Sequence, residues 1–316
     1  MLAHTKGKTK SRLVRTFSEH WQMLIMALPG VALMFMFSYM PMFGTVIAFK
    51  RYKVKQGIFG SALMKPLFRN FEILFRKNSQ AIVAIRNTLF LNFLFIVVGV
   101  AFAVFLALMF NEINNRLYKR VTQSLSFLPY FISTVVVGIF ATSLMGYESG
   151  TINSVISSLG GEKINFYARP GMWPVIMLIV NIWKGAGSSS VVYLAAITGI
   201  DASYYEAARI DGATRRDEIR YITLPLLLPT IIVMTLLAIG KIMNADFGLF
   251  YNVKADNPNL YPTTDVLDTY IYRTLRQTGD MGISSAVGLF QSTCSLILVL
   301  VSNAVARRID ENSALF

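Results

Sequence analysis

Residues 206–225 read EAARIDGATRRDEIRYITLP, and eight of these twenty residues carry a formal charge. The chain around them is apolar: of its 316 residues, 54% are hydrophobic and only 15% are charged, and the mean hydropathy is +0.52. Soluble domains carry about 25% charged residues. The composition therefore predicts a membrane protein in which residues 206–225 form a polar segment outside the bilayer.

Long apolar runs on both sides of this segment predict the membrane-spanning helices. A run of about 20 residues crosses about 30 Å of hydrocarbon at 1.5 Å per residue. Six candidates have this length, the fourth being interrupted only by Lys184: 21–49, 87–111, 121–147, 170–200, 221–240 and 281–306. We therefore predict an all-α membrane protein with six transmembrane helices. The first run is too long for a signal-peptide core, so it is expected to stay as an uncleaved helix.

The basic residues between the spans bear on orientation. The net charge of +13 comes from loops, which fits anionic lipid headgroups better than nucleic acid. Lys and Arg number 14 on the side of the termini and 14 on the other side. The tie is due to residues 50–86, in which a stretch at about 66–85 alternates apolar residues with cations and predicts an amphipathic helix lying along the membrane surface. Without this segment the count is 14 against 5, and we expect both termini in the cytoplasm.

The predicted chain thus has a basic cytoplasmic tail at 1–20, a membrane domain at 21–306, a cytoplasmic loop at 201–225 and a cytoplasmic tail at 307–316. Within the loop, Ser203 and Glu206 have the spacing of a capping box that starts a helix at about Tyr204. Gly212 suits the left-handed position that ends a helix. Thr214 and Asp217 offer a second start, from which a helix runs to Tyr221, and the membrane helix then begins near Pro225 and Pro229.

Two interpretations of this helix–glycine–helix elbow compete. One is a solvated connection between spans, as for any charged loop. The other is a docking element, because small residues at Ala207, Ala208 and Ala213 allow a partner to approach the backbone, and the neighbouring arginines donate charge-assisted hydrogen bonds.

The spacing of Glu206-Ala207-Ala208, Gly212 and Ile222-x-Leu224-Pro225 resembles the EAA loop of ATP-binding-cassette (ABC) importer permeases. Further stretches are similar to the carbohydrate-uptake permeases, in particular the LplB-like oligosaccharide permeases and the maltose permease pair: NEINNRLYKRVTQSLSFLPYFIS at 111–133, IWKGAGSSSVVYLAAITGID at 182–201 and NPNLYPTTDVLDTYIYR at 257–273. The likeness covers about residues 25–310. It implies the architecture of a type I ABC importer permease in a bacterial cytoplasmic membrane.

The resemblance also implies partners. The elbow would be a coupling helix seated in a cleft of a separate ATPase, with these docking residues: Glu206, Ala207, Ala208, Asp211, Gly212 and Arg215. Glu206 would face an arginine of the ATPase, which is compatible with a capping role as well. The expected partners are a second homologous permease, two nucleotide-binding ATPase subunits, an extracellular or periplasmic solute-binding protein and a carbohydrate.

The chain itself lacks the residues of an ATPase or of a catalytic centre. Gly7-Lys8-Thr9 resembles the end of a phosphate-binding loop, but the glycine required five residues earlier is Leu2. Its two histidines, His4 and His20, are both close to the N-terminus, and the lone Cys294 excludes an internal disulfide. We therefore expect no enzyme and no cofactor in this chain, with ATP and Mg²⁺ bound by the partner ATPase.

Polar residues within the apolar spans are candidates for a substrate path. Such groups are costly in a membrane unless they face a cavity or another helix. The predicted path residues are Asn181, Trp183, Lys184, Lys241, Asn244, Asp246 and Gln291, and further polar positions are Asn87, Asn92, Ser292 and Thr293. Amides, hydroxyls and a flat aromatic ring suit a sugar, whereas hydrogen bonding between helices explains any one of these residues equally well. Lys241 and Asp246 are expected to neutralise each other along a helix.

Two further alternatives concern the protein as a whole. A transporter or channel working alone would call for inverted repeats or a broken-helix ion site, and the sequence shows neither. A membrane enzyme would need a cluster of catalytic groups in the spans. The outer loop at 244–280 is open to two interpretations, contact with a binding protein and packing over the mouth of the pore, and we expect a mixture of the two. The identity of the sugar stays open at this stage.

Overall fold

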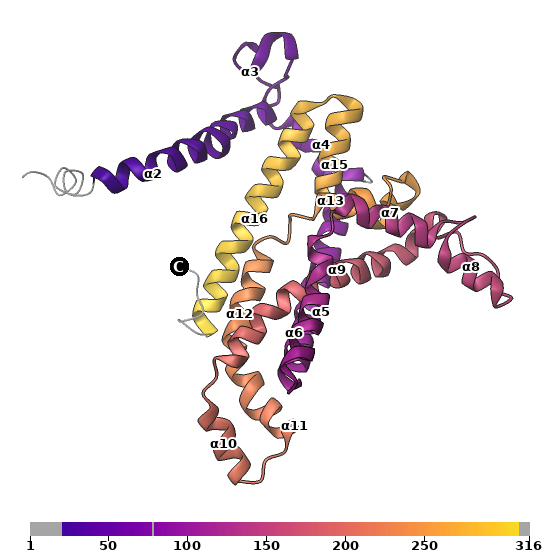
Figure 1. Ribbon diagram of the computed structural model, residues 1–316. Helices are drawn as coiled ribbons and strands as arrows, with labels where there is room; N and C mark the ends of the chain where they lie inside the picture. The colour runs from indigo at the N-terminus through magenta and orange to yellow at the C-terminus, as the bar shows by residue number, and fades with distance from the viewer. Residues whose placement is uncertain (1–20, 78, 310–316) are drawn as a thin grey trace, which may run out of the picture.

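The computed structural model describes residues 21–77 and 79–309 of the chain, and these are almost entirely helical (Figure 1). In this described part, β-structure is limited to one isolated antiparallel bridge between Lys50 and Leu63. The tails at 1–20 and 310–316, with Gly7-Lys8-Thr9, His4 and His20, lie outside the described residues. The longest helices are α2 (Trp21–Met34), α5 (Gln80–Glu112), α6 (Arg116–Phe131), α7 (Thr134–Met145), α9 (Trp173–Thr198), α12 (Leu224–Ile239) and α16 (Met281–Ile309).

Five of the six predicted spans are confirmed as long apolar helices. They cover Trp21–Phe49, Gln80–Glu112, Pro170–Thr198, Arg215–Ile239 and Met281–Val305 in the described chain. The first continues from α2 through a π-helical turn η1 (Phe35–Tyr39) and a 3₁₀ segment η2 (Met40–Phe49). In Figure 1 α2 extends away from the other helices, and all of its side chains are exposed.

The third predicted span, 121–147, is not one straight helix. Its residues lie in α6 and α7, which are bent by 96° at a short break. The break has two local causes. Pro129 cannot donate a hydrogen bond in the last turn of α6, and the hydroxyl of Ser133 accepts from the backbone N–H of Val135 at 3.3 Å, which starts a new helix.

The predicted amphipathic helix at 66–85 is interrupted. Its residues form a 3₁₀ turn η4 (Arg69–Phe71) and a single turn α4 (Glu72–Phe75), and α5 begins at Gln80. Ser79 explains the division, because its side chain accepts from the N–H of Ile82 at 3.2 Å and starts α5 there. The last third of the predicted amphipathic helix, from Gln80 on, is therefore the beginning of a membrane helix.

Short elements connect the long helices. They are η3 (Val54–Gln56), α3 (Gly57–Gly60), α8 (Thr151–Ser158), η5 (Phe166–Ala168), η6 (Pro170–Met172), α10 (Ala202–Ile210), α11 (Arg215–Asp217), η7 (Glu218–Thr223), α13 (Phe247–Val253), η8 (Pro258–Leu260), α14 (Tyr261–Thr264), α15 (Leu267–Arg273) and η9 (Thr274–Thr278). α10 and α11 project together from one end of the molecule (Figure 1).

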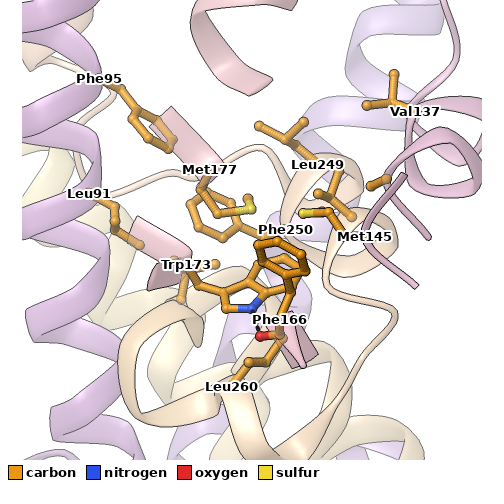
Figure 2. Close-up of a cluster of buried hydrophobic side chains, with 13 residues drawn as sticks. Leu91, Phe95, Val137, Met145, Phe166, Trp173, Met177, Leu249, Phe250 and Leu260 are labelled. Carbon is orange, nitrogen blue, oxygen red and sulfur yellow. Dashed lines mark hydrogen bonds between the residues drawn. The ribbon is translucent and has the colours of Figure 1, made fainter. Parts of the chain in front are cut away.

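The helices are held together around α5 and α9, which pack against each other. The largest buried cluster surrounds Trp173 at the start of α9 (Figure 2). Its indole N–H donates to the carbonyl of Phe166 at 2.8 Å, so the one polar atom of this ring is satisfied inside an apolar cluster. Phe95 of α5 stacks on Phe250 of α13 with centroids 5.9 Å apart, which brings the segment after α12 back onto the bundle.

Candidate functional site

The first helix of the elbow at 201–225 begins two residues earlier than its sequence predicts. Helix α10 starts at Ala202, and its cap is Asp201, whose carboxylate accepts from the N–H of Ser203 at 2.9 Å. This hydrogen bond lowers the pKa of Asp201. The predicted capping box of Ser203 and Glu206 is therefore wrong, because the stronger acceptor two residues upstream already starts the helix. Glu206 is left exposed on the helix surface.

The glycine and the second cap of the elbow are confirmed. Gly212 has a φ of +80°, in the left-handed region where a side chain would be strained. Thr214 and Asp217 form a reciprocal capping box at the start of α11. The chain therefore reverses at Gly212 and starts a new helix three residues later, at Arg215.

The second helix of the elbow continues into the membrane. α11, the π-helical turn η7 and α12 form one span from Arg215 to Ile239, so the expected end at Tyr221 is not present. Pro225 lies in the first turn of α12 and Pro229 lies inside it. The wider hydrogen-bond pattern of η7 lets the helix pass Pro225 without a break. The second helix of the elbow is thus continuous with α12.

A buried carboxylate holds the two halves of the elbow together. Glu218 is 3% exposed and accepts from Nε of Arg209 at 2.7 Å and from Nη1 of Arg215. Arg215 also donates from Nε to Glu112 at 2.9 Å, at the last residue of α5. Sequence reasoning missed Glu112 and Glu218, although the spacing of Arg215 and Glu218 by three residues favours a contact on one helix face.

The face of the elbow that points away from the bundle is open to solvent. Ile210, the last residue of α10, is 86% exposed at the tip of the elbow. Of the predicted docking residues, Ala208 is half-buried and the others are exposed: Glu206, Ala207, Asp211, Gly212 and Arg215. The structure thus places these residues on one projecting element.

A second feature is a cavity of about 340 Å³ about halfway along α5 and α9. Its walls are α5, α9, α12 and the turn at 240–244. The polar side chains on these walls are Asn92, Asn181, Ser189, Tyr193, Lys241 and Asn244. Ser189 and Tyr193 were not predicted, although both follow Asn181 at multiples of four residues and so lie on one face of α9.

Three of the seven predicted path residues line this cavity: Asn181, Lys241 and Asn244. Trp183 lies on a different face of α9, where it is 45% exposed and lines two neighbouring apolar hollows. The three remaining residues have structural partners in the described chain, as follows.

Lys184 donates from Nζ to the carbonyls of Tyr130 at 3.1 Å and Ile132 at 2.8 Å, at the break between α6 and α7. Gln291 donates to the carbonyl of Met243 at 2.8 Å. Asp246 caps α13 by accepting from the N–H of Leu249 at 3.0 Å.

The expected pairing of Lys241 with Asp246 along one helix is wrong. α12 ends at Ile239, and a tight turn separates the two residues. Asn92 and Asn87 follow the interhelical interpretation, since Asn92 donates to the carbonyl of Ile242 at 2.8 Å and Asn87 donates to that of Tyr261 at 3.3 Å. Asn92 also reaches the cavity.

The outer segment at 244–280 is folded onto the end of the bundle opposite the elbow, where it contains a buried charge cluster. Asp265 accepts from Nη1 of Arg273 at 2.9 Å and lies 3.6 Å from Nζ of Lys254, which is fully buried. Burial lowers the pKa of Lys254, while burial raises the pKa of Tyr261, which packs against both cations, to about 12. Packing over the bundle is therefore confirmed for this segment.

These features define a class of protein. Long apolar helices around a cavity that is lined in part by polar side chains, with a projecting charged elbow continuous with one of them, are the parts of a membrane transport permease. Residues 99–311 match the model of the family described as binding-protein-dependent transport system inner membrane component. The chain belongs to this family. It is a multi-pass membrane protein and a permease subunit of the ABC importer class, not an enzyme.

Similar proteins cover almost the whole chain. The polygalacturonan/rhamnogalacturonan transport system permease protein YteP of Bacillus subtilis is 34% identical over 97% of this chain and 94% of its own length. Protein LplB of the same organism is 33% identical, over 97% of this chain and 95% of its own. A chain in the crystal structure of a bacterial alginate ABC transporter, in complex with an alginate pentasaccharide-bound periplasmic protein, is 36% identical with a TM-score of 0.85, covering 95% of this chain and 98% of that one. The predicted resemblance to carbohydrate ABC permeases and the predicted fold class are thereby confirmed.

Proposed function

We propose that this chain and a second homologous permease together form the path along which an oligosaccharide crosses the membrane, driven by two ATPase subunits that bind its elbow. The observation that carries the proposal is that the elbow and the central cavity are directly connected. The exposed elbow joins α12 without a break and is paired with the end of α5, and both helices line the central cavity.

The substrate class is supported by the cavity and by the relatives. Three amides, a hydroxyl and a phenol along a passage of this size suit the hydroxyl groups of a sugar. The relatives are named for the transport of polygalacturonan or rhamnogalacturonan and of alginate, all carbohydrates. The alginate transporter was solved with a periplasmic protein, and we propose a solute-binding protein for this chain too, delivering cargo at the end opposite the elbow.

The energy source is assigned to the partner. ATP and Mg²⁺ are bound by the ATPase subunits, which contact Glu206, Ala207, Ala208, Asp211, Gly212 and Arg215 of the elbow. The elbow and both tails, 1–20 and 307–316, then lie in the cytoplasm, while residues 21–306 form the permease domain. Residues 66–77 lie along the outer membrane surface.

A co-purification experiment tests the elbow. Gly212→Val forces a branched side chain into a backbone with φ +80°, and we expect the partner ATPase to be lost from the purified complex. Gly160→Val is the matched control, because Gly160 has the same φ of +80° and lies beyond α8, away from the elbow. An ATPase that stays bound to the Gly212→Val protein would contradict the docking role.

Transport tests the function itself. Purified complexes in liposomes should take up oligosaccharide only with ATP and the binding protein present. Glu206→Gln keeps the shape of the side chain and removes its charge, and we expect ATP-driven uptake to fall while the protein still inserts normally. Uptake by the permease in the absence of any ATPase would instead indicate a transporter that works alone.

A further inference from the structure

Lys241 is the charged residue of the central cavity. Sixteen residues line this cavity in the described chain, and the other fifteen are uncharged. We propose that Lys241 selects acidic saccharides, so that the cargo carries carboxylates, as uronic acid chains do, and one of them binds the Lys241 ammonium during passage. The inference rests on the proposed function and names the substrate class of the same cavity.

The position of Lys241 is fixed by its backbone. Its N–H donates to the carbonyl of Ala238 at 3.0 Å and its own carbonyl accepts from Asn244 at 2.9 Å, so it begins the turn that ends α12. The side chain is exposed at the cavity wall about halfway along α5 and α9. A cation at this depth is costly unless it meets water or an anion, so its presence in a lined cavity points to a ligand.

The neighbouring acidic groups are engaged elsewhere. The Asp246 carboxylate accepts from the N–H of Leu249 at 3.0 Å, within α13. The Asp268 carboxylate accepts from the N–H of Ala245 at 2.8 Å and from Nε2 of Gln291 at 3.2 Å. Neither of them lines the cavity.

The neighbouring cation is also engaged. Lys184 lies on α9, three residues after Asn181. Its ammonium donates to the carbonyls of Tyr130 and Ile132 at the end of α6. The cavity wall therefore carries a formal charge of +1 in the described chain, and its field is set by Lys241.

The remaining polar groups suit the rest of a sugar acid. Asn181, Ser189 and Tyr193 lie along one side of α9, and Asn244 lies on the turn with Lys241. Amides and hydroxyls bind sugar hydroxyl groups, whereas an ammonium binds a carboxylate through a charge-assisted hydrogen bond that is stronger than a neutral one. A neutral sugar would leave the ammonium without a partner, which lowers its affinity relative to an acidic one.

The test compares two probes of equal length, trigalacturonate and the neutral galactotriose. The complete importer is reconstituted with its binding protein, and ATP-driven uptake of each probe is measured. Since every variant is assayed with the same binding protein, the preference of the binding protein cancels when a variant is compared with wild type.

We expect the wild-type importer to favour trigalacturonate. Lys241→Gln should lower the ratio of trigalacturonate to galactotriose uptake by about ten- to a hundredfold. Lys241→Arg should keep most of the ratio, because it keeps the charge. Lys163→Gln removes an exposed lysine that pairs with Glu148, outside the cavity, and should leave the ratio unchanged.

Two results would overturn the inference while leaving the proposed function intact. They are an unchanged ratio in Lys241→Gln and a wild-type importer that favours galactotriose. Absence of ATP-driven uptake of both probes by the wild type would count against the proposed function itself, and against this inference with it.

Discussion

Nε of Arg215 lies 2.9 Å from the Glu112 carboxylate, and this ion pair joins the first residue of α11 to the last residue of α5. α5 lines the cavity about halfway along its length. The elbow is therefore connected to two walls of the cavity, through the chain to α12 and through the ion pair to α5. A partner that pulls on the elbow would therefore act on the cavity walls through both α12 and α5.

Replacing Glu112 by Gln tests this connection. Both side chains are partly exposed, at 49% for Arg215 and 30% for Glu112, so the loss of stability should stay below about 1 kcal/mol. We expect uptake per ATP hydrolysed to fall nevertheless, because α5 no longer follows the elbow. Glu148→Gln, which breaks the exposed pair with Lys163 in the segments that flank α8, is the control. Equal uptake per ATP in the wild type and Glu112→Gln would show that the pair has no part in coupling.

Two glycines of α9 should respond differently to the same change. A Cβ on Gly187 would lie 1.9 Å from the backbone oxygen of Ser126 in α6, whereas a Cβ on Gly185 would have nothing within 4 Å. We expect Gly187→Ala to cost about 1–3 kcal/mol or more, since two helix backbones must separate. Gly185→Ala should be neutral or slightly stabilising, because Ala is the better helix former. Thermal unfolding in detergent measures both, and similar melting temperatures would contradict the close approach of α6 and α9.

Lys184 should hold the bend between α6 and α7. Its ammonium donates to the carbonyls of Tyr130 and Ile132, at the end of α6 where the chain bends by 96°. Without the ammonium, these two carbonyls lose a hydrogen-bond donor. We expect Lys184→Met to speed hydrogen–deuterium exchange of the backbone at 131–137 by about tenfold or more. Lys184→Arg should restore part of the protection. Unchanged exchange in Lys184→Met would mean that helix packing alone sets the bend.

The predictions from sequence succeed where the cause is local. Gly212 and the Thr214 and Asp217 capping box depend on neighbouring residues alone, and five spans follow from apolar length. The Ser203 cap failed because Asp201, two residues away, competes for the same helix end. The straight helix at 121–147 failed for a related reason, since Ser133 and Pro129 outweigh the apolar pattern around them.

The substrate path was harder to predict because it depends on which face of a helix meets which neighbour. Asn181 and Lys184 are close in sequence, yet one lines the cavity and the other caps α6. Asn92 serves the cavity and an interhelical hydrogen bond at once, so the two interpretations weighed for it are not exclusive. The ion pair of Glu112 with Arg215 joins residues 103 positions apart, and such a contact has no local signal.

The charge cluster of the outer segment leads to a last prediction. Asp265 lies between two buried cations, Arg273 and Lys254, so Asp265→Asn leaves both without their carboxylate and should cost about 3–5 kcal/mol. Lys254→Met should be close to neutral or stabilising, because burial already lowers the pKa of Lys254 from 10.5.

In the pH range between this lowered pKa and 10.5, the unfolded chain binds more protons than the folded one, so wild-type stability gains a rising contribution as the pH increases. That contribution should be missing in Lys254→Met. Melting temperatures of the three proteins in detergent, measured from pH 7 upward, check both expectations. Equal losses of stability in Asp265→Asn and Lys254→Met would contradict this prediction. They would mean that Asp265 needs the Lys254 ammonium as a partner in addition to Arg273.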